Sequence, residues 1–109
     1  NDPVMRQKLA RAHTGLQLLK LNALRSMSAK GVPGPEASIS KLFWGTWHRD
    51  LGELMMEIMG PAGLIAEDHP YELTLEQKLF LFTRSDTIYG GSNEIQRNVL
   101  GERVLGLPR

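Results

Sequence analysis

The 109-residue sequence contains no cysteine, few aromatic residues and no excess of one charge sign. The absence of cysteine excludes disulfides, cysteine-based zinc sites and thiol nucleophiles. Aromatic residues make up only 6% of the chain and do not alternate with basic ones, which argues against a surface for single-stranded nucleic acid. The net charge of +1 provides no strong field toward nucleic acid or an anionic membrane. We therefore expect no nucleic-acid partner.

Long apolar runs and strand-like alternation are also missing. No run approaches the ~18 apolar residues that can cross a bilayer, so we expect no membrane span. No segment alternates convincingly between apolar and polar residues, so we expect no strand. The chain opens Asn1-Asp2-Pro3, without an initiating methionine or a secretory leader, and we expect it to be a piece of a longer protein. Its length predicts one domain, large enough to bury a core.

Helical spacing dominates the first half of the chain. A helix is predicted to begin at Asp2-Pro3, with Asp as the cap and Pro in the first position, and to run to about Ser28. The loop Ala29–Pro35 separates it from a second helix that begins at Pro35-Glu36 and runs to about Met59. The predicted apolar face of the first helix is Met5, Leu9, Ala12, Leu16, Leu19 and Ala23, widened by Leu18, Leu21 and Leu24. The predicted face of the second helix is Ile39, Phe43, Trp47, Leu51, Leu54 and Ile58.

Glycines and a capping signal shape the rest of the pattern. Gly45 and Gly52 interrupt the second helix, and small residues at such places can let another helix come close. Thr74 and Gln77 form a predicted capping box for a third helix that ends at Tyr89-Gly90. Its face would hold Leu75, Leu79 and Phe82, with Asp86 as a candidate for the next position. A fourth helix, from about Asn93 to Leu105, would carry Ile95, Val99, Glu102 or Arg103, and Leu105. Short links between four helices predict an all-α, antiparallel up-down four-helix bundle.

The histidines offer no metal site by their spacing. His13, His48 and His69 are scattered, and none belongs to a Glu-x-x-His pair. We therefore expect no metal. Arg84 and Asp86 are interpreted as solvated or locally paired rather than catalytic, and the Trp44/Trp47 pair as helix packing.

The turn Gly90-Gly91-Ser92-Asn93 is the strongest candidate for a ligand contact. Glycine can adopt positive φ and lets another molecule approach the backbone. Ser92 and Asn93 are both good caps, and with Asn93 as the cap Gln96 would complete a capping box. The free N–H groups of the helix start would suit a phosphate or a carbonyl. From the residues alone, a corner between helices that binds nothing remains the alternative.

The segment Ile88-Tyr-Gly-Gly-Ser-Asn-Glu-Ile-Gln-Arg97, followed by Gly101-Glu-Arg-Val-Leu-Gly-Leu-Pro-Arg109, closely resembles the C-terminal signature of acyl-CoA dehydrogenases. Upstream, Ala37–Phe43 resembles the start of an earlier helix of that family. The segment Glu57–Leu64 stands where the family has a flavin-contact turn. Helix order and loop positions are similar over essentially all of the chain, and the Leu-Gly-Leu-Pro-Arg ending resembles bacterial members.

The resemblance implies a specific chemistry and fold. Acyl-CoA dehydrogenases oxidise acyl-CoA thioesters to trans-2-enoyl-CoA: a carboxylate removes the α-proton while the β-hydrogen passes as hydride to FAD. The chain would be the family's C-terminal helical bundle, residues 1–109, without that bundle's first helix. It would belong to a cytoplasmic bacterial dimer or tetramer, with homo- or hetero-oligomers both possible. Electron-transfer flavoprotein or a similar acceptor would receive the electrons.

The resemblance also assigns residues. It implies that Gly91 lies next to the acyl-CoA and that Ser92, Asn93 and Glu94 contact FAD. The turn with Glu57, Gly60 and Pro61 stands where one subunit reaches the FAD of its neighbour.

Two departures from the family pattern bear on the chemistry. Gly90 stands where the common catalytic Glu is found, and glycine cannot abstract a proton. Glu57 replaces a Gln, which places an acid near a diphosphate unless it is paired or turned away. The interpretations are therefore a dehydrogenase whose base precedes Asn1, a non-catalytic partner subunit of a hetero-oligomer, or a flavin enzyme of the same fold such as a monooxygenase or nitroalkane oxidase.

Overall fold

The computed structural model describes residues 2–28, 34, 37–66 and 72–108. In these residues the chain forms four α-helices, α1 (Pro3–Ser28), α2 (Ala37–Met59), α3 (Leu75–Phe82) and α4 (Asn93–Arg103), and no strand. Two short 3₁₀ helices, η1 (Gly60–Leu64) and η2 (Ser85–Thr87), follow α2 and α3. The predicted all-α class is confirmed. The predicted loop at Ala29–Pro35, except Gly34, and the helix start at Pro35-Glu36 lie outside the described residues.

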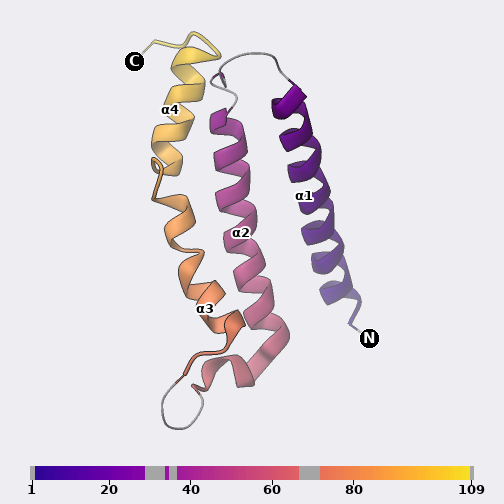
Figure 1. Ribbon diagram of the computed structural model, residues 1–109. Coiled ribbons are helices and arrows are strands. Elements are labelled where there is room, and N and C mark those ends of the chain that lie inside the picture. Colours follow the sequence, from indigo (N-terminus) through magenta and orange to yellow (C-terminus); the bar gives the residue numbers. More distant parts are fainter. Residues whose placement is uncertain (1, 29–33, 35–36, 67–71, 109) are drawn as a thin grey trace.

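Helix α2 is the centre of the arrangement. It runs antiparallel to α1 on one side, while α3, η2 and α4 follow one another along its other side in the opposite direction to α2 (Figure 1). The up-down topology predicted from the short links is therefore confirmed. This arrangement gives α2 two seams, one with α1 and one with the segment from α3 to α4.

Two predicted helix starts are confirmed by their hydrogen bonds. Oδ1 of Asp2 accepts from the N–H of Val4 at 2.8 Å. Thr74 and Gln77 form the full capping box: Thr74 Oγ1 accepts from the Gln77 N–H and Gln77 Oε1 accepts from the Thr74 N–H. The Gln77 amide group also donates to the carbonyls of Gly63 and Ile65, which fastens η1 to the start of α3.

The third helix is shorter than predicted. It was expected to continue to Tyr89, but α3 ends at Phe82 and the chain continues through η2. The hydroxyls of Thr83, Ser85 and Thr87 each donate to the backbone carbonyl three residues earlier. Such hydroxyl bonds compete with the α-helical ladder, which accounts for the tighter winding.

The seam between α2 and the α3–η2 segment is closed by small residues. A Cβ atom at Gly45 would lie 2.8 Å from the backbone oxygen of Asp86, and one at Gly52 would lie 2.8 Å from Oγ1 of Thr83. Both glycines are buried, as are Thr83 and Asp86. The expectation that these glycines let another segment come close is confirmed.

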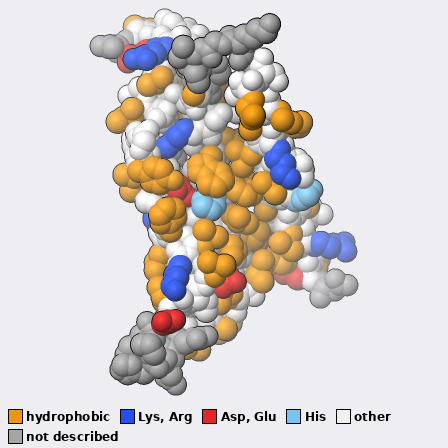
Figure 2. Space-filling model, viewed as in Figure 1, with side chains coloured by type: hydrophobic (Ala, Val, Ile, Leu, Met, Phe, Trp, Pro, Cys, Tyr) orange, Lys and Arg blue, Asp and Glu red, His pale blue; other side chains and the backbone are white. Residues whose placement is uncertain are grey.

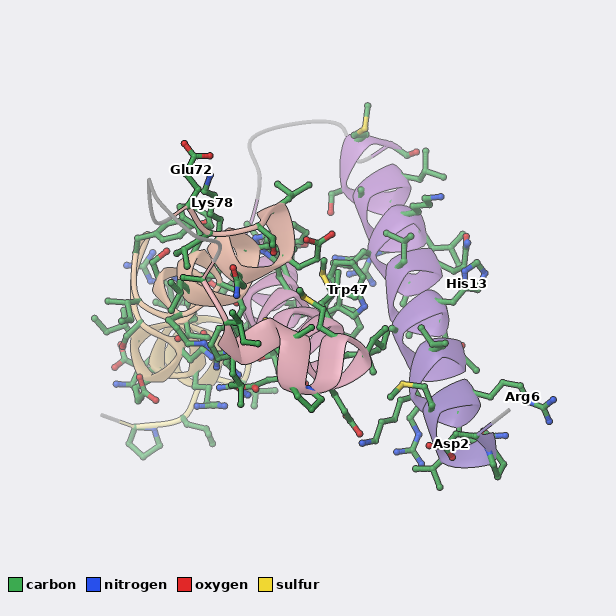
Figure 3. The ribbon with its side chains drawn as sticks, turned by 90° about the horizontal axis from the view of Figure 1, so that it is seen from below. Asp2, Arg6, His13, Trp47, Glu72 and Lys78 are labelled. Atoms are coloured by element: carbon green, nitrogen blue, oxygen red, sulfur yellow. The ribbon has the colours of Figure 1, made fainter. Side chains whose placement is uncertain are left out.

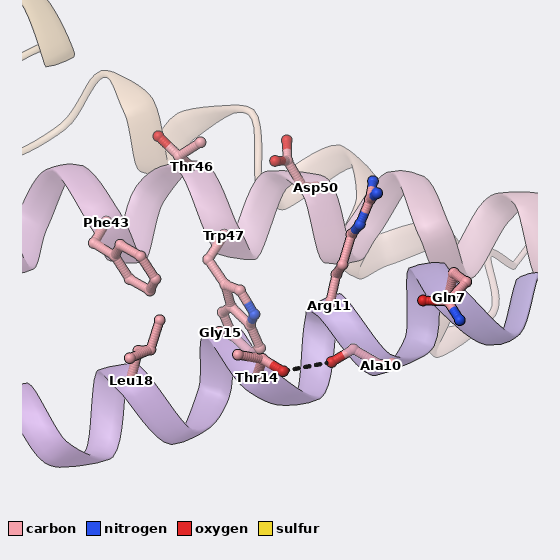
Figure 4. Close-up of a pocket in the computed structure, with 10 residues that line it drawn as sticks. All are labelled: Gln7, Ala10, Arg11, Thr14, Gly15, Leu18, Phe43, Thr46, Trp47 and Asp50. Carbon is pink, nitrogen blue, oxygen red and sulfur yellow. Dashed lines mark hydrogen bonds between the residues drawn. The ribbon is translucent and has the colours of Figure 1, made fainter. Parts of the chain in front are cut away.

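The seam between α1 and α2 is built from an aromatic side chain and a glycine. Trp47 points from α2 toward α1, where its Nε1 donates to the carbonyl of Ala12 at 2.9 Å (Figure 3). A Cβ atom at Gly15 would lie 2.4 Å from Trp47 Cδ1, so the indole in this position requires glycine there. Beside the indole, an open groove of about 480 Å³ is bordered by Leu18, Phe43 and Asp50 among others (Figure 4).

The predicted apolar faces are only partly buried. Of the described residues, Leu54 is the one buried hydrophobic side chain, whereas Leu18, Leu21 and Leu24 of α1 are exposed. On α3, Leu75 and Phe82 are exposed, whereas Gln77 is buried with its amide group bonded to the Gly63 and Ile65 carbonyls. After α3, Thr83 and Asp86 are buried against the α2 glycines. Figure 2 shows hydrophobic side chains spread over one face of the molecule. None of the described helices combines the length and apolarity that crossing a membrane requires.

Candidate functional site

The glycine corner, residues 90–93, joins Tyr89 to α4. Gly90 and Gly91 have φ angles of +68° and +95°, which are in the left-handed region that favours glycine. Ser92, in extended conformation, is the cap of α4, and its hydroxyl accepts from the N–H of Ile95 at 3.4 Å. The alternative in which Asn93 is the cap is therefore wrong, because Asn93 is already the first helical residue.

Gln96 ties the corner to the helix that follows it. Instead of completing a capping box with Asn93, its Nε2 donates to the carbonyl of Gly90 at 2.8 Å. A Cβ atom at Gly91 would lie 2.7 Å from the same Nε2 atom, so a side chain there would push Gln96 away. No atom of the described residues lies within 4 Å of a Cβ atom built at Gly90, so a side chain there would meet backbone strain but none of these neighbours.

Charged and polar groups gather around the start of α4. The pKa of the Glu94 carboxyl is lowered by a hydrogen bond from its own backbone N–H and by one from Ser92. Lys41, on the facing part of α2, contributes a weaker electrostatic effect in the same direction. The Nζ atom of Lys41 and the Oδ1 atom of Asn93 are buried and have no hydrogen-bond partner among the described residues. The corner therefore combines helix N–H groups with a buried cation that sequence reasoning did not single out.

A buried carboxylate precedes the corner. Asp86 accepts from Nδ1 of His48 at 2.5 Å and from the hydroxyl of Tyr89 at 2.6 Å. The hydrogen bond to Asp86 raises the pKa of Tyr89. Asp86 was predicted to be solvated or locally paired: it is buried, with an exposed fraction of 1%, and is paired across the seam with α2. The sequence did contain a signal for this burial, because Asp86 falls on the predicted apolar face of the third helix. A carboxylate on a buried face needs hydrogen-bond partners.

The second predicted contact lies at the other end of α2. Gly60 has a φ angle of +57° and begins η1, which also contains Pro61. Glu57 is half exposed and its carboxylate accepts from Nζ of Lys8 on α1 at 2.5 Å, so the acid is paired. At a helical rise of about 1.5 Å per residue, Lys41 and Met59 are separated by roughly 27 Å along α2. The structure therefore places the two predicted contact regions apart (Figure 1).

The histidines do not converge. His13 points away from α2 (Figure 3), His48 is bound to Asp86, and His69 lies outside the described residues. Within the part of the chain that the structure describes, no three His, Asp or Glu side chains are placed to hold a metal ion.

Comparisons with known proteins give the same family as the C-terminal signature. Residues 1–105 match the model of the acyl-CoA dehydrogenase C-terminal domain. The chain is 51% identical to acyl-CoA dehydrogenase IpdE1 of Mycobacterium tuberculosis and 50% identical to that of Mycolicibacterium smegmatis, in both cases over its whole length. It spans 28% and 27% of those two proteins.

A solved structure agrees with these relatives. The ChsE4-ChsE5 complex from Mycobacterium tuberculosis matches the whole chain with a TM-score of 0.82 and 29% identity, over 29% of the matched chain. The sequence signature, the helix order and these matches agree, and the chain belongs to the acyl-CoA dehydrogenase family, as a bacterial-type C-terminal helical domain.

Proposed function

We propose that this chain is the C-terminal bundle of an FAD-dependent enzyme that oxidises an acyl-CoA thioester to its trans-2-enoyl-CoA. The observation that carries the proposal is the glycine corner, where two left-handed glycines expose backbone beside the start of α4. The corner stands in the segment that resembles the family signature, and the family membership supplies the reaction class.

The residues around the corner are suited to a diphosphate-containing flavin. A helix start favours phosphate, and the buried Nζ of Lys41, which has no hydrogen-bond partner among the described residues, supplies a positive charge nearby. We assign Gly91 to the acyl-CoA contact and Ser92, Asn93 and Glu94 to FAD. Because the Asn93 side chain is buried, its contact would be through the backbone N–H. When bound, FAD would accept the β-hydrogen as hydride.

The base that removes the α-proton is assigned to another part of the full-length protein. Gly90 has no group that can accept a proton, and Asp86 has both carboxylate oxygens occupied by donors. The proposal therefore places the base before Asn1, on the first helix of the family bundle.

A non-catalytic partner subunit is the second candidate. It is favoured by Gly90 together with the match to the ChsE4-ChsE5 complex, which is formed by two differently named chains. The exposed hydrophobic side chains of α1 would then be covered by the rest of the protein or by a neighbouring subunit.

The remaining assignments follow from the same proposal. The turn with Glu57, Gly60 and Pro61 would reach the FAD of a neighbouring subunit in a homo- or hetero-oligomer. The separation of the two contact regions along α2 is compatible with contacts to two different FAD molecules. Electron-transfer flavoprotein or a similar acceptor would reoxidise the flavin, and the enzyme would be cytoplasmic.

The test is anaerobic addition of acyl-CoA substrates to the full-length flavoprotein, alone and with any partner subunit that copurifies. The proposal expects the visible flavin absorbance to bleach with at least one acyl chain. Bleaching only in a mixture with a partner that carries the base would favour the second candidate. Absence of bleaching with every acyl-CoA and every combination would overturn the dehydrogenase proposal. Residues 1–109 alone are expected to bind no stoichiometric FAD.

A further inference from the structure

A chain of hydrogen bonds leads from the middle of α2 to the residue that precedes Gly90. Nδ1 of His48 donates to Oδ2 of Asp86 at 2.5 Å, and the Tyr89 hydroxyl donates to Oδ1 of the same carboxylate at 2.6 Å. The side chain of Asp86 is completely buried and that of His48 is 13% exposed. An ionised carboxylate only accepts hydrogen bonds, so Nδ1 of His48 carries its hydrogen in this arrangement.

His48 and Tyr89, at the two ends of this series of hydrogen bonds, are held in different ways. The imidazole of His48 is stacked against the indole of Trp44, with ring centroids 4.4 Å apart. The backbone of Asp86 is pressed against Gly45, where a Cβ atom would be only 2.8 Å from the carbonyl oxygen. Tyr89, in contrast, is half exposed, and its hydroxyl is held by the Asp86 carboxylate, with Trp44 of α2 as a second side-chain partner.

The glycine corner depends on such anchors because it has no side chains of its own. Any ligand contact made by Gly90 or Gly91 uses backbone atoms, and their positions are set by the residues on either side. Downstream, Gln96 holds the Gly90 carbonyl and Ser92 caps α4. Upstream, the side-chain anchor is Tyr89, through Asp86, to His48.

We propose that His48, Asp86 and Tyr89 are positioning residues that fix the backbone of the glycine corner for its contacts with acyl-CoA and FAD. This inference rests on the proposed function. It assigns no proton transfer to the three residues, because Asp86 is buried and both of its oxygens are occupied. Loss of these hydrogen bonds would loosen the corner and weaken ligand binding more than it slows the chemical step.

The experiment uses the full-length flavoprotein with any partner subunit. Tyr89→Phe removes only the hydroxyl, and we expect it to raise KM for acyl-CoA by about tenfold, the order of one hydrogen bond to a charged group. We expect kcat to change by less than about twofold and the visible flavin band to shift on acyl-CoA binding differently from the wild type.

Two further variants separate positioning from stability. His48→Leu removes the donor and is expected to raise KM as Tyr89→Phe does, whereas His48→Asn keeps an N–H near the position of Nδ1 and is expected to restore most of the affinity. Ser85→Ala is the matched control, because Ser85 lies in the same short helix as Asp86. The change removes one side-chain hydrogen bond, to the Phe82 carbonyl, and leaves the backbone bond from the Tyr89 N–H to the Ser85 carbonyl in place. It is expected to leave KM unchanged.

Different results would contradict the positioning role and the proposed function. If Tyr89→Phe and His48→Leu lower the thermal midpoint but leave KM and the flavin band as in the wild type, the three residues are structural only and the inference is wrong. Equal effects of His48→Asn and His48→Leu on KM would also overturn it. If the wild-type protein itself binds no FAD and is not bleached by acyl-CoA, the proposed function fails, and this result is distinct from a failure of the positioning role.

Discussion

The two seams of α2 show how one helix can pack by opposite means. Toward α3 and η2 it presents glycines, and the contact is made by backbone and by buried polar groups such as Thr83 and Asp86. Toward α1 it presents Trp47, and an open groove remains beside the indole. The seam with α3 and η2 (the closed seam) includes residues that come shortly before the glycine corner in the chain. The seam with α1 (the open seam) lies on the other side of α2. The close backbone contact at Gly45 is therefore made by Asp86, a few residues before the corner that we propose as a ligand contact.

The largest effect is expected at the closed seam. Gly45→Ala places a methyl group 2.8 Å from the backbone oxygen of Asp86, which cannot move without shifting η2. Overpacking of this kind costs about 1–3 kcal/mol, from which the better helix propensity of Ala recovers up to about 1 kcal/mol. Thermal unfolding of the full-length protein measures the effect. The control is Gly101→Ala, whose methyl group would meet only Leu107 at 3.7 Å and is expected to be stabilising; destabilisation by both variants alike would show that the seam is not special.

A smaller loss is expected at the open seam. Gly15→Ala meets the Trp47 indole at 2.4 Å, nominally a closer contact than at Gly45, but a side chain bordering a groove can move aside. The cost is the hydrogen bond from Nε1 to the Ala12 carbonyl, about 1 kcal/mol, largely offset by helix propensity.

A double-mutant cycle sharpens this point. In a Trp47→Leu background the contact with the indole no longer exists, so Gly15→Ala is expected to become stabilising. An unchanged effect of Gly15→Ala in the two backgrounds would mean that the indole does not limit the approach of α1 to α2.

A loss of about 1 kcal/mol is expected for Thr83→Val, which keeps the shape of a completely buried side chain and removes its hydroxyl bond to the Phe80 carbonyl. The carbonyl retains the Nε–H of Arg84 as a donor. Thermal unfolding measures the effect, and a loss above that of Gly45→Ala would place the stability of the seam in its polar groups rather than in its close backbone approach.

A small effect is also expected at the Lys8–Glu57 pair that links the far ends of α1 and α2. Both side chains are exposed by more than 40% (41% and 47%), and exposed ion pairs contribute about 0–1 kcal/mol. Lys8→Met is therefore expected to change the thermal midpoint little, and high salt to reduce the difference further. A loss as large as that of Gly45→Ala would mean that the open seam depends on this pair.

Helix starts and the general topology could be predicted because their determinants are local. Asp2, the Thr74–Gln77 box and the spacing of apolar residues act within a few positions of the chain. The break after Phe82 was not predicted, because hydroxyl-to-carbonyl bonds at Thr83, Ser85 and Thr87 compete with the helix only weakly and in no fixed sequence pattern.

The site was predictable to a different degree. The glycine corner could be identified from Gly90-Gly91 and the helix start, although Ser92 rather than Asn93 is the cap. The pair of His48 and Asp86 was missed, because residues 38 positions apart meet only through the seam between α2 and η2. The prediction that Leu75 and Phe82 are buried was wrong, because the buried positions of this segment are held by Gln77 and Thr83, whose polar groups are hydrogen-bonded to backbone carbonyls and which a search for apolar periodicity passes over.

The claim that the glycine corner is a ligand contact made by backbone atoms can be measured directly by amide hydrogen exchange in the full-length protein. Peptides covering residues 88–96 would be compared without flavin, with FAD, and with FAD plus a non-reacting acyl-CoA analogue. The account predicts stepwise protection at residues 90–94, with the control peptides of α1 near Thr14 changing less. Unchanged exchange at the corner, with protection elsewhere proving that the ligands are bound, would contradict it.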